Sequence, residues 1–334
     1  MSIVAYAAKG PRGNLERFEY EPAPLGPHDI EISVTHCGIC RSDLHLIDDD
    51  WGVTEYPLVA GHEIVGEVAE MGPEVRRLKK GQRVGVGWQC ASCYECDQCL
   101  SGRDNLCPDQ QATCVGRHGG FAEAVRVDSR FAFSIPDSIR SDKAAPLLCG
   151  GTTVYSPLRH YQIGPAMKVG VIGVGGLGHL ALQFANAMGC EVTAFSSTAA
   201  KEDEASFFGA DRFVHLQDER QLEAAAGTLD FLLSTVHVDL DWRCYLNMLR
   251  PGGTLCFVGA SPGPLNLSPL TLITGAKAVA GSPIGSRAMI REMLEFAARN
   301  SIEARSELFA MADVNAAIAR LRENRARYRI VLRN

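Results

Sequence analysis

The 334 residues are too many for one ordinary hydrophobic core, so two domains are expected. With 46% hydrophobic and 22% charged residues, the composition is typical of a globular protein. The net charge is −6 and the basic residues are dispersed, so binding to nucleic acid or to an anionic membrane is not expected. Apolar runs fall short of the roughly 20 residues that span a bilayer, and the start MSIVAYAAKGPRG lacks the pattern of a secretory signal, so we expect a cytoplasmic location.

Three regimes follow one another along the chain. Residues 1–146 contain short β-type runs separated by Gly and Pro, among them IEISVTHCG, HEIVGEVAEMG and FAEAVRV, and predict an irregular all-β domain. In residues 147–284, apolar strands such as KVGVIGVG and LDFLLSTV alternate with helices, which predicts a doubly wound parallel sheet of the Rossmann type. Residues 285–334 hold two amphipathic helices and the short strand YRIVL, and we expect them to rejoin the first domain. The predicted fold class is α/β.

Five thiols crowd into the stretch WQCASCYECDQCLSGRDNLC, where a tetrahedral zinc would need only four. Two sets fit by spacing: Cys90 to Cys99 in an unbroken ladder, or Cys93, Cys96, Cys99 and Cys107. Four ligands within ten consecutive residues leave little chain to wrap a tetrahedron, whereas the LSGRDNL return brings Cys107 in from another side. We therefore predict a closed structural zinc site on the second set, with Cys90 surplus.

A glycine-rich turn closes the strand KVGVI and opens the helix LGHLALQFANAMG. Gly173 permits the tight turn, Gly175 lets the backbone approach a pyrophosphate, and Gly178 lets helix and strand pack closely, with Gly176 and Leu177 completing the turn. Because the turn lies inside a strand–helix alternation, it predicts a dinucleotide-binding site.

The end of the next strand indicates which dinucleotide. An NAD site should present an acid there to hold the ribose 2′-hydroxyl, but the strand ends in Ser196, Ser197 and Thr198, followed by Lys201. Hydroxyls and an ammonium donate to a 2′-phosphate, so NADP(H) is the predicted cofactor.

Three short segments outside the five-thiol stretch contain further zinc donors. CGICRSDLH, AGHEIVG and LLCGGTTVYSPL supply Cys40, His62 and Cys149, with Glu63 beside the imidazole. Two thiolates and one imidazole with an open fourth position are the ligands of an alcohol-oxidising zinc. A metal there eases proton loss from an alcohol and polarises an aldehyde carbonyl.

The combination and order of these motifs resemble the zinc-dependent medium-chain alcohol dehydrogenases, in particular the cinnamyl alcohol dehydrogenase branch with its bacterial aldehyde reductases. The resemblance runs over essentially the full length and includes CGICRSDLH, GHEIVGEV, SCYECDQC, LLCGGTTVYSPLRH, GVGGLGH, SSTAAK and GSPIGS. It implies a GroES-like catalytic domain that holds both zinc sites, a Rossmann domain, and hydride transfer between NADP(H) and a primary alcohol or aldehyde. It also implies a homodimer, with a tetramer as the alternative.

The resemblance assigns roles around the working zinc. Cys40, His62 and Cys149 match its ligands, and Glu63 matches a glutamate that binds zinc in the resting state and yields to water or substrate. Asp43 matches an acid that orients the ligand histidine.

Further positions match groups around the substrate. Ser42 matches the hydroxyl that takes the alcohol proton and passes it towards a ribose hydroxyl, and His45 matches the histidine that relays it to solvent. Arg41 replaces the histidine common in this branch and would meet the cofactor pyrophosphate. Trp51 matches a residue on the substrate cleft, although packing explains a tryptophan there equally well.

Six more positions match contacts to the nicotinamide half of the cofactor: Thr153, Thr235, Val258, Gly259, Ser282 and Ile284.

Three other kinds of protein share part of this pattern. A zinc-free quinone or enoyl reductase would keep the glycine turn but lack Cys40, His62 and Cys149. A reductase of conjugated carbonyls would have lost part of the proton relay, whereas Ser42 and His45 are present. A non-catalytic NADP-binding or zinc-scaffold protein would not need every catalytic position filled.

Overall fold

The computed structural model describes residues 2–334, which form two compact units. The first comprises the chain up to Thr152 together with Ile284–Asn334, and the second is Thr153–Pro283. The predicted boundary after residue 146 therefore differs from the one observed. The turn that follows residue 146 packs against strand β4 (Glu63–Met71) and helices α3 (Ser141–Pro146) and α10 (Arg287–Arg299), which belong to the first unit.

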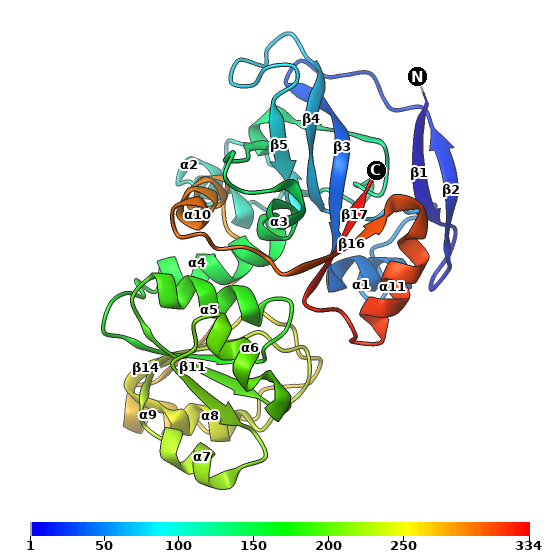
Figure 1. The fold of residues 1–334 in the computed structure, drawn as a ribbon. Helices are drawn as coiled ribbons and strands as arrows, with labels where there is room; N and C mark the ends of the chain where they lie inside the picture. The colour runs from blue at the N-terminus through cyan, green and yellow to red at the C-terminus, as the bar shows by residue number, and fades with distance from the viewer. Residues whose placement is uncertain (1) are drawn as a thin grey trace. The chain divides into compact units, whose positions relative to one another are not determined.

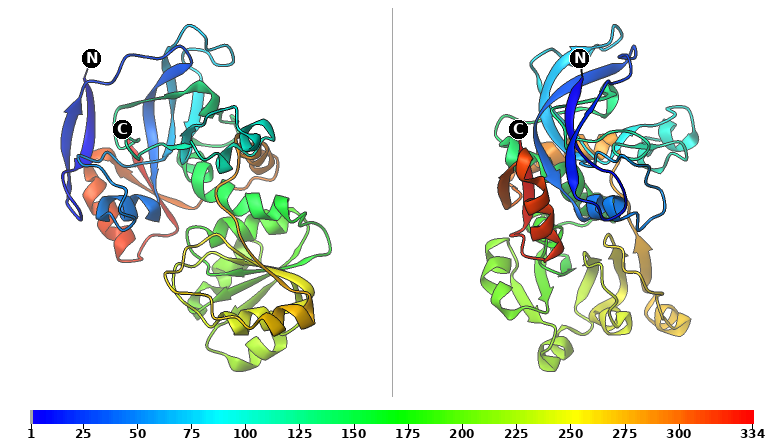
Figure 2. Two further views of the ribbon diagram at one scale, coloured as in Figure 1. Left: turned by 180° about the vertical axis from the view of Figure 1, so that it is seen from behind. Right: turned by 90° about the vertical axis from the view of Figure 1, so that its right-hand side faces the viewer.

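The first unit is built on a seven-stranded sheet in the order β16-β17-β3-β4-β5-β9, with β8 also pairing with β3. The strands are β16 (Ser306–Ala310), β17 (Arg329–Arg333), β3 (Asp29–Ile39), β4 (Glu63–Met71), β5 (Arg83–Val86), β9 (Phe133–Ser134) and β8 (Ala124–Asp128). The C-terminal segment YRIVL lies at β17, which pairs antiparallel with β3, so the end of the chain lies beside an early strand (Figures 1 and 2).

Within residues 2–152 and 284–334, two small sheets and several helices accompany this sheet. The sheets are β1 (Ile3–Ala8) with β2 (Leu15–Tyr20), and β6 (Gln89–Ala91) with β7 (Gln111–Ala112). The helices are α1 (Arg41–Asp48), α2 (Asp97–Leu100), α3 (Ser141–Pro146), α10 (Arg287–Arg299) and α11 (Val314–Arg322). Alternate side chains of β3, namely Ile30, Ile32 and Val34, are buried in the core, as the two-residue period of a strand requires.

The second unit is a six-stranded parallel sheet in the order β12-β11-β10-β13-β14-β15. Its strands are β10 (Lys168–Ile172), β11 (Glu191–Ser196), β12 (Arg212–His215), β13 (Leu229–Ser234), β14 (Leu249–Phe257) and β15 (Ala278–Gly281). Its helices are α4 (Thr152–His160), α5 (Gly178–Ala187), α6 (Glu202–Phe207), α7 (Glu219–Ala225), α8 (Trp242–Met248) and α9 (Pro269–Gly275).

The strand order of this unit reverses between β10 and β13, the switch point at which ligands bind in doubly wound sheets. Helices α5 and α6 lie on one face, and α7, α8 and α9 lie on the other (Figure 1). An irregular β unit plus a parallel α/β unit confirms the predicted fold class. Among residues 2–334, no helix combines the length and apolar character that crossing a membrane would require.

Candidate active site and metal centres

Cys40 stands at the end of β3 and forms the N-cap of α1. Its backbone N–H donates to Asp43 Oδ2 at 2.8 Å, so the aspartate closes the first turn of the helix and fixes the thiol at its start. The Sγ of Cys40 lies 3.8 Å from the hydroxyl of Ser42, two residues further along in the same turn. A short helix start therefore places a thiol and a hydroxyl together.

Asp43 also fixes the imidazole of His62. The carboxylate is fully buried, and its Oδ1 accepts from the backbone N–H of Gly61 at 2.9 Å and lies 2.9 Å from His62 Nδ1. In the neutral imidazole, a proton held at Nδ1 by Asp43 makes Nε2 the nitrogen that can bind a metal. The structure thus brings together the acid and the histidine that the sequence predicted to act as a pair.

Cys149 arrives on a π-helical turn, Leu147–Gly151, between α3 and α4. Its Sγ lies 3.3 Å from His62 Nε2 and 3.9 Å from Cys40 Sγ. A tetrahedral zinc with Zn–S bonds of about 2.3 Å separates its sulfur ligands by about 3.8 Å, so these spacings match the edges of a zinc tetrahedron. Donation from the Cys149 thiol lowers the pKa of Cys40 well below its ordinary value, which favours a thiolate there.

Glu63 supplies a fourth donor to this group. One ligand atom from each of Cys40, His62, Glu63 and Cys149 lies within 4.8 Å of the others, and all four residues are buried. Arg329 of β17 donates to Glu63 Oε1, whereas Glu63 Oε2 is buried and has no hydrogen-bond partner among residues 2–334. Burial raises the pKa of Glu63 to about 8 against the opposing effect of Arg329. An orphaned oxygen beside two thiols and an imidazole fits an exchangeable zinc ligand.

Helix α1 also carries His45, whose Nδ1 lies 2.7 Å from Asp50 Oδ2. The imidazole ring lies 5.2 Å from the ring of Trp51, which is 45% exposed and so forms an open rim. Trp88 stands deeper: its ring contacts Trp51 at 6.1 Å and meets the ring of His62 edge-on at 5.0 Å. Aromatic rings thus lead from the surface to the metal donors.

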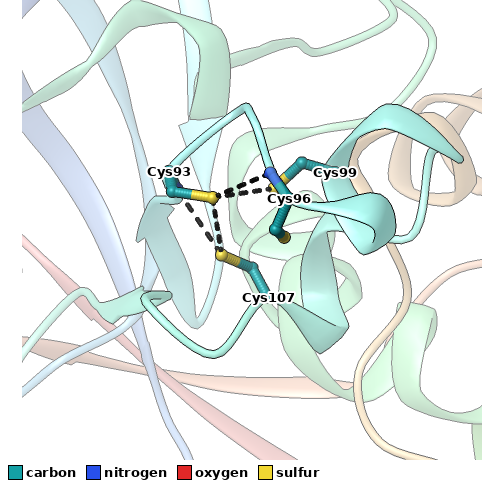
Figure 3. A group of neighbouring side chains, drawn as sticks. All are labelled: Cys93, Cys96, Cys99 and Cys107. Atoms are coloured by element: carbon teal, nitrogen blue, oxygen red, sulfur yellow. Dashed lines mark hydrogen bonds between the residues drawn. The ribbon is translucent and has the colours of Figure 1, made fainter.

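The second group of thiols is Cys93, Cys96, Cys99 and Cys107, whose sulfurs gather around one point (Figure 3). Cys93 Sγ lies 3.9 Å from that of Cys99 and 3.5 Å from that of Cys107. These spacings again match zinc–thiolate geometry. Backbone N–H groups of Glu95 and Cys96 donate to Cys93 and lower its pKa to about 7, so a thiolate forms readily.

Cys90 lies outside this group. Its thiol is fully buried and donates to the carbonyl oxygen of Gln111 at 3.4 Å, and burial raises its pKa to about 11. A neutral, hydrogen-bonded thiol has the character of a packing residue rather than a metal ligand.

In the second unit, the predicted glycine turn joins β10 to α5. Gly173 has a φ of +89°, and a Cβ at Gly178 would lie 1.8 Å from the carbonyl oxygen of Gly173, so both positions require glycine. The Nζ of Lys201 donates to the carbonyl oxygen of Val174 at 2.5 Å, which places its ammonium at this turn. The cation and the phosphate-binding turn are therefore neighbours.

The hydroxyls at the tip of β11 differ from one another. Ser196 is buried and its oxygen accepts from the backbone N–H of Thr198 at 3.1 Å, whereas Ser197 and Thr198 are exposed. Thr235 Oγ1 donates to the carbonyl oxygen of Ile172 at 2.8 Å and thus follows β13 at the switch point.

The remaining expected cofactor contacts are distributed over both units. Thr153, Val258, Gly259 and Ser282 belong to the second, and Arg41 and Ile284 to the first. The guanidinium of Arg41 donates to Asn324 Oδ1 at 2.7 Å.

Four residues near the metal donors were not predicted. They are Asp50, Trp88, Arg329 and the buried Cys114, which lies within 4.8 Å of His62 and Asp43. The sequence carried no signal that pointed to any of the four.

A buried two-thiol, one-imidazole donor group in a β unit, a closed four-thiol group and a parallel α/β unit with a phosphate-binding turn define a zinc-binding dehydrogenase. Residues 26–137 match the alcohol dehydrogenase GroES-like domain, and residues 176–299 match the zinc-binding dehydrogenase family. The chain belongs to this family of zinc-binding alcohol dehydrogenases, which confirms the predicted family.

Individual relatives are close over their whole length. The chain is 45% identical over 330 residues to the aldehyde reductase AdhA of Synechocystis sp., covering 99% of this chain and 98% of the relative. A cinnamyl alcohol dehydrogenase of Sorghum bicolor is 40% identical with a TM-score of 0.96, covering 100% and 98% of the two chains. The cinnamyl alcohol dehydrogenase of Helicobacter pylori, solved with NADP(H), is 31% identical with a TM-score of 0.91 and the same coverage.

Proposed function

We propose that this protein is a zinc-dependent, NADP(H)-linked oxidoreductase of primary alcohols and aldehydes that works mainly as an aldehyde reductase. The observation that carries the proposal is the buried group of Cys40, His62, Cys149 and the unpartnered oxygen of Glu63. Three fixed donors and one exchangeable donor leave a position for substrate, as catalytic zinc sites do.

The chain's own residues would prepare the site and move the proton. Cys40, His62 and Cys149 would hold zinc, which when bound acts as a Lewis acid on the carbonyl oxygen. Asp43 orients the imidazole of His62 through Nδ1, so that Nε2 is the nitrogen that would bind zinc. In the direction of reduction, NADPH when bound would supply hydride to the carbonyl carbon, and the Ser42 hydroxyl would give the product oxygen its proton. His45, oriented by Asp50, exchanges protons with solvent.

The aromatic side chains support a substrate with an aromatic or extended apolar body. Trp88 lies against the ring of His62, and Trp51 lies next to Trp88. A flat substrate would stack on or meet these rings edge-on, an interaction worth about 0.5–1.5 kcal/mol beyond the burial of its area. This arrangement favours aromatic aldehydes while leaving short aliphatic ones as substrates.

Preference for NADP(H) is supported by the position of Lys201 at the glycine turn, with Ser197 and Thr198 exposed beside it. These groups donate to a 2′-phosphate and offer no carboxylate to a 2′-hydroxyl. The relative from Helicobacter pylori was solved with NADP(H), which agrees with this preference.

A cytoplasmic homodimer is also part of the proposal. Strand β15 is the edge of the six-stranded sheet, and the adjoining helix α9 exposes Leu270 and Ile273 at 65% and 74%. An open strand edge beside exposed apolar side chains is suited to pairing with a second copy.

Zinc analysis and a panel of aldehydes test the enzyme proposal together. We expect two zinc ions per chain and oxidation of NADPH on addition of benzaldehyde or cinnamaldehyde, followed at 340 nm. Zinc-replete protein that is inert towards the whole panel would refute the reductase and favour a scaffold, whereas reduction of only the conjugated C=C bond, detected by product analysis, would identify a reductase of conjugated carbonyls. A higher kcat/KM with NADH than with NADPH would refute the cofactor preference.

A further inference from the structure

The four thiols lie in residues 93–107, here called the zinc lobe. The loop between its third and fourth thiols binds the start of α10. Asn105 Nδ2 donates to the carbonyl oxygen of Ile284 at 2.6 Å, two residues before the N-cap of that helix. The backbone N–H of Arg287, its first residue, donates to Asp104 Oδ2 at 3.2 Å. Two neighbouring side chains of the lobe therefore hold both ends of the segment Ile284–Arg287.

Asp104 makes the stronger of these attachments. Its side chain is 3% exposed, and Oδ1 lies 3.4 Å from Arg287 Nε. The Arg287 guanidinium lies 5.1 Å from the ring of Tyr94, the residue after Cys93, and 5.0 Å from that of Phe131. A buried carboxylate at a helix N-terminus stabilises the first turn, and a cation against two rings adds to it.

The geometry of this loop depends on the four thiols. The turn Asp104–Leu106 runs directly into Cys107, whose backbone N–H donates to the carbonyl oxygen of Asp104 at 3.2 Å. Gln89 Nε2 donates to that same oxygen at 2.8 Å. Because Cys107 belongs to the closed donor set, displacing it would displace Asp104 and Asn105 with it.

The segment Ile284–Arg287 begins where the chain returns from the second unit to the first. Pro283 is the last residue of the second unit and Ile284 is the first residue on return to the first unit. Ile284 is also one of the positions expected to contact the nicotinamide half of the cofactor.

We propose that Asp104 and Asn105 are positioning residues through which the four-thiol lobe fixes Ile284–Arg287 and thereby raises the affinity for NADP(H). The proposal rests on the proposed function, because it takes Ile284 to be a cofactor contact. Under this proposal the four-thiol zinc site, which takes no part in the reaction, has a measurable effect on the binding of NADP(H).

Asn105→Ala tests the proposal, because Asn105 is only half-buried and the variant should fold. We expect two zinc ions per chain, faster hydrogen exchange at the backbone amides of residues 284–290 in the cofactor-free protein, and a Kd for NADPH raised about three- to tenfold, the loss of one hydrogen bond. Kd would be followed by quenching of tryptophan fluorescence, which needs no turnover. Asp104→Asn, which weakens the stronger attachment, should act in the same direction.

The matched control is Asn300→Ala. Asn300 Nδ2 donates to the carbonyl oxygen of Phe296 at 2.9 Å, so this variant removes the same kind of hydrogen bond at the other end of α10. It should leave Kd and exchange at residues 284–290 unchanged. Unchanged exchange in Asn105→Ala, or faster exchange with an unchanged Kd, would overturn the inference. Wild-type protein that fails to oxidise NADPH with any aldehyde refutes the proposed function instead, while exchange still tests the attachment.

Discussion

The pair of Arg329 and Glu63 allows a prediction about stability. Both side chains are buried, at 6% and 0% exposure, so water cannot replace either partner. Arg329→Met leaves the Glu63 carboxylate without its guanidinium. Removing one partner of a buried ion pair costs about 3–5 kcal/mol. For a unit of this size, about 2–4 °C of Tm is lost per kcal/mol, which predicts a fall of about 6–20 °C in Tm.

Protonation of Glu63 would remove the unpaired buried charge and so reduce the loss of stability in Arg329→Met. Burial already raises its pKa to about 8, and loss of Arg329 raises the pKa further. When the pKa of a carboxyl is higher in the folded than in the unfolded state, the free energy of unfolding falls as the pH rises from the unfolded towards the folded pKa. The deficit of Arg329→Met relative to wild type should therefore be smaller at pH 6 than at pH 9.

Differential scanning calorimetry of the zinc-free protein measures this effect. Arg17→Met is the matched control, because Arg17 and Glu19 form an exposed pair at 2.8 Å, for which a loss of under about 1 kcal/mol is expected. Adding Glu63→Gln to Arg329→Met should restore much of the lost Tm, since both buried charges are then gone. An Arg329→Met protein as stable as Arg17→Met, at both pH values, would refute the reasoning.

Four further predictions concern the metals, the cofactor and the substrate. Cys107→Ser should bind one zinc per chain by mass spectrometry, while Cys90→Ser keeps two; equal zinc contents would contradict the assignment of the lobe. Lys201→Ala should lower kcat/KM with NADPH by about 10–100-fold, the worth of a charge-assisted hydrogen bond, and change that with NADH less than twofold; equal losses with both cofactors would argue against a 2′-phosphate contact. Trp88→Ala should raise KM for benzaldehyde about tenfold but not that for acetaldehyde, and a uniform rise would remove Trp88 from the substrate wall. Ser42→Ala should lower kcat by about 10²–10⁴-fold with KM little changed, and an unaltered kcat would exclude its hydroxyl from proton transfer.

Local signals were sufficient to predict much of the fold. The run KVGVI became β10, and the glycine turn between it and α5 has the positive φ at Gly173 that its sequence requires. These features depend on periodicity and on glycine, which act over a few residues. The boundary at the end of the first unit could not be predicted in this way. Cys149 belongs to the first unit through tertiary packing, and no change in composition marks that boundary.

Contacts between distant residues could not be predicted from local patterns. Arg329 and Glu63 are 266 residues apart, and only the pairing of β17 with β3 beside β4 brings them together. The attachment of Asn105 to Ile284 spans 179 residues in the same way. Such pairs depend on the packing of whole elements, so a polar residue in a strand or loop gives no hint of its partner.

Charge distinguishes the two zinc sites beyond their ligand counts. Four thiolates carry four negative charges against two on zinc, and in the lobe the excess is met by backbone N–H groups donating to Cys93. At the proposed catalytic site, the thiolates of Cys40 and Cys149 would balance the two charges of a bound zinc, and Arg329 pairs with Glu63. A zinc ion whose charge is balanced polarises a carbonyl oxygen more strongly than one bound by excess thiolate. Under the proposed function, Arg329 would therefore support reactivity as well as stability, because without it the Glu63 carboxylate would add its charge to the site that polarises the substrate.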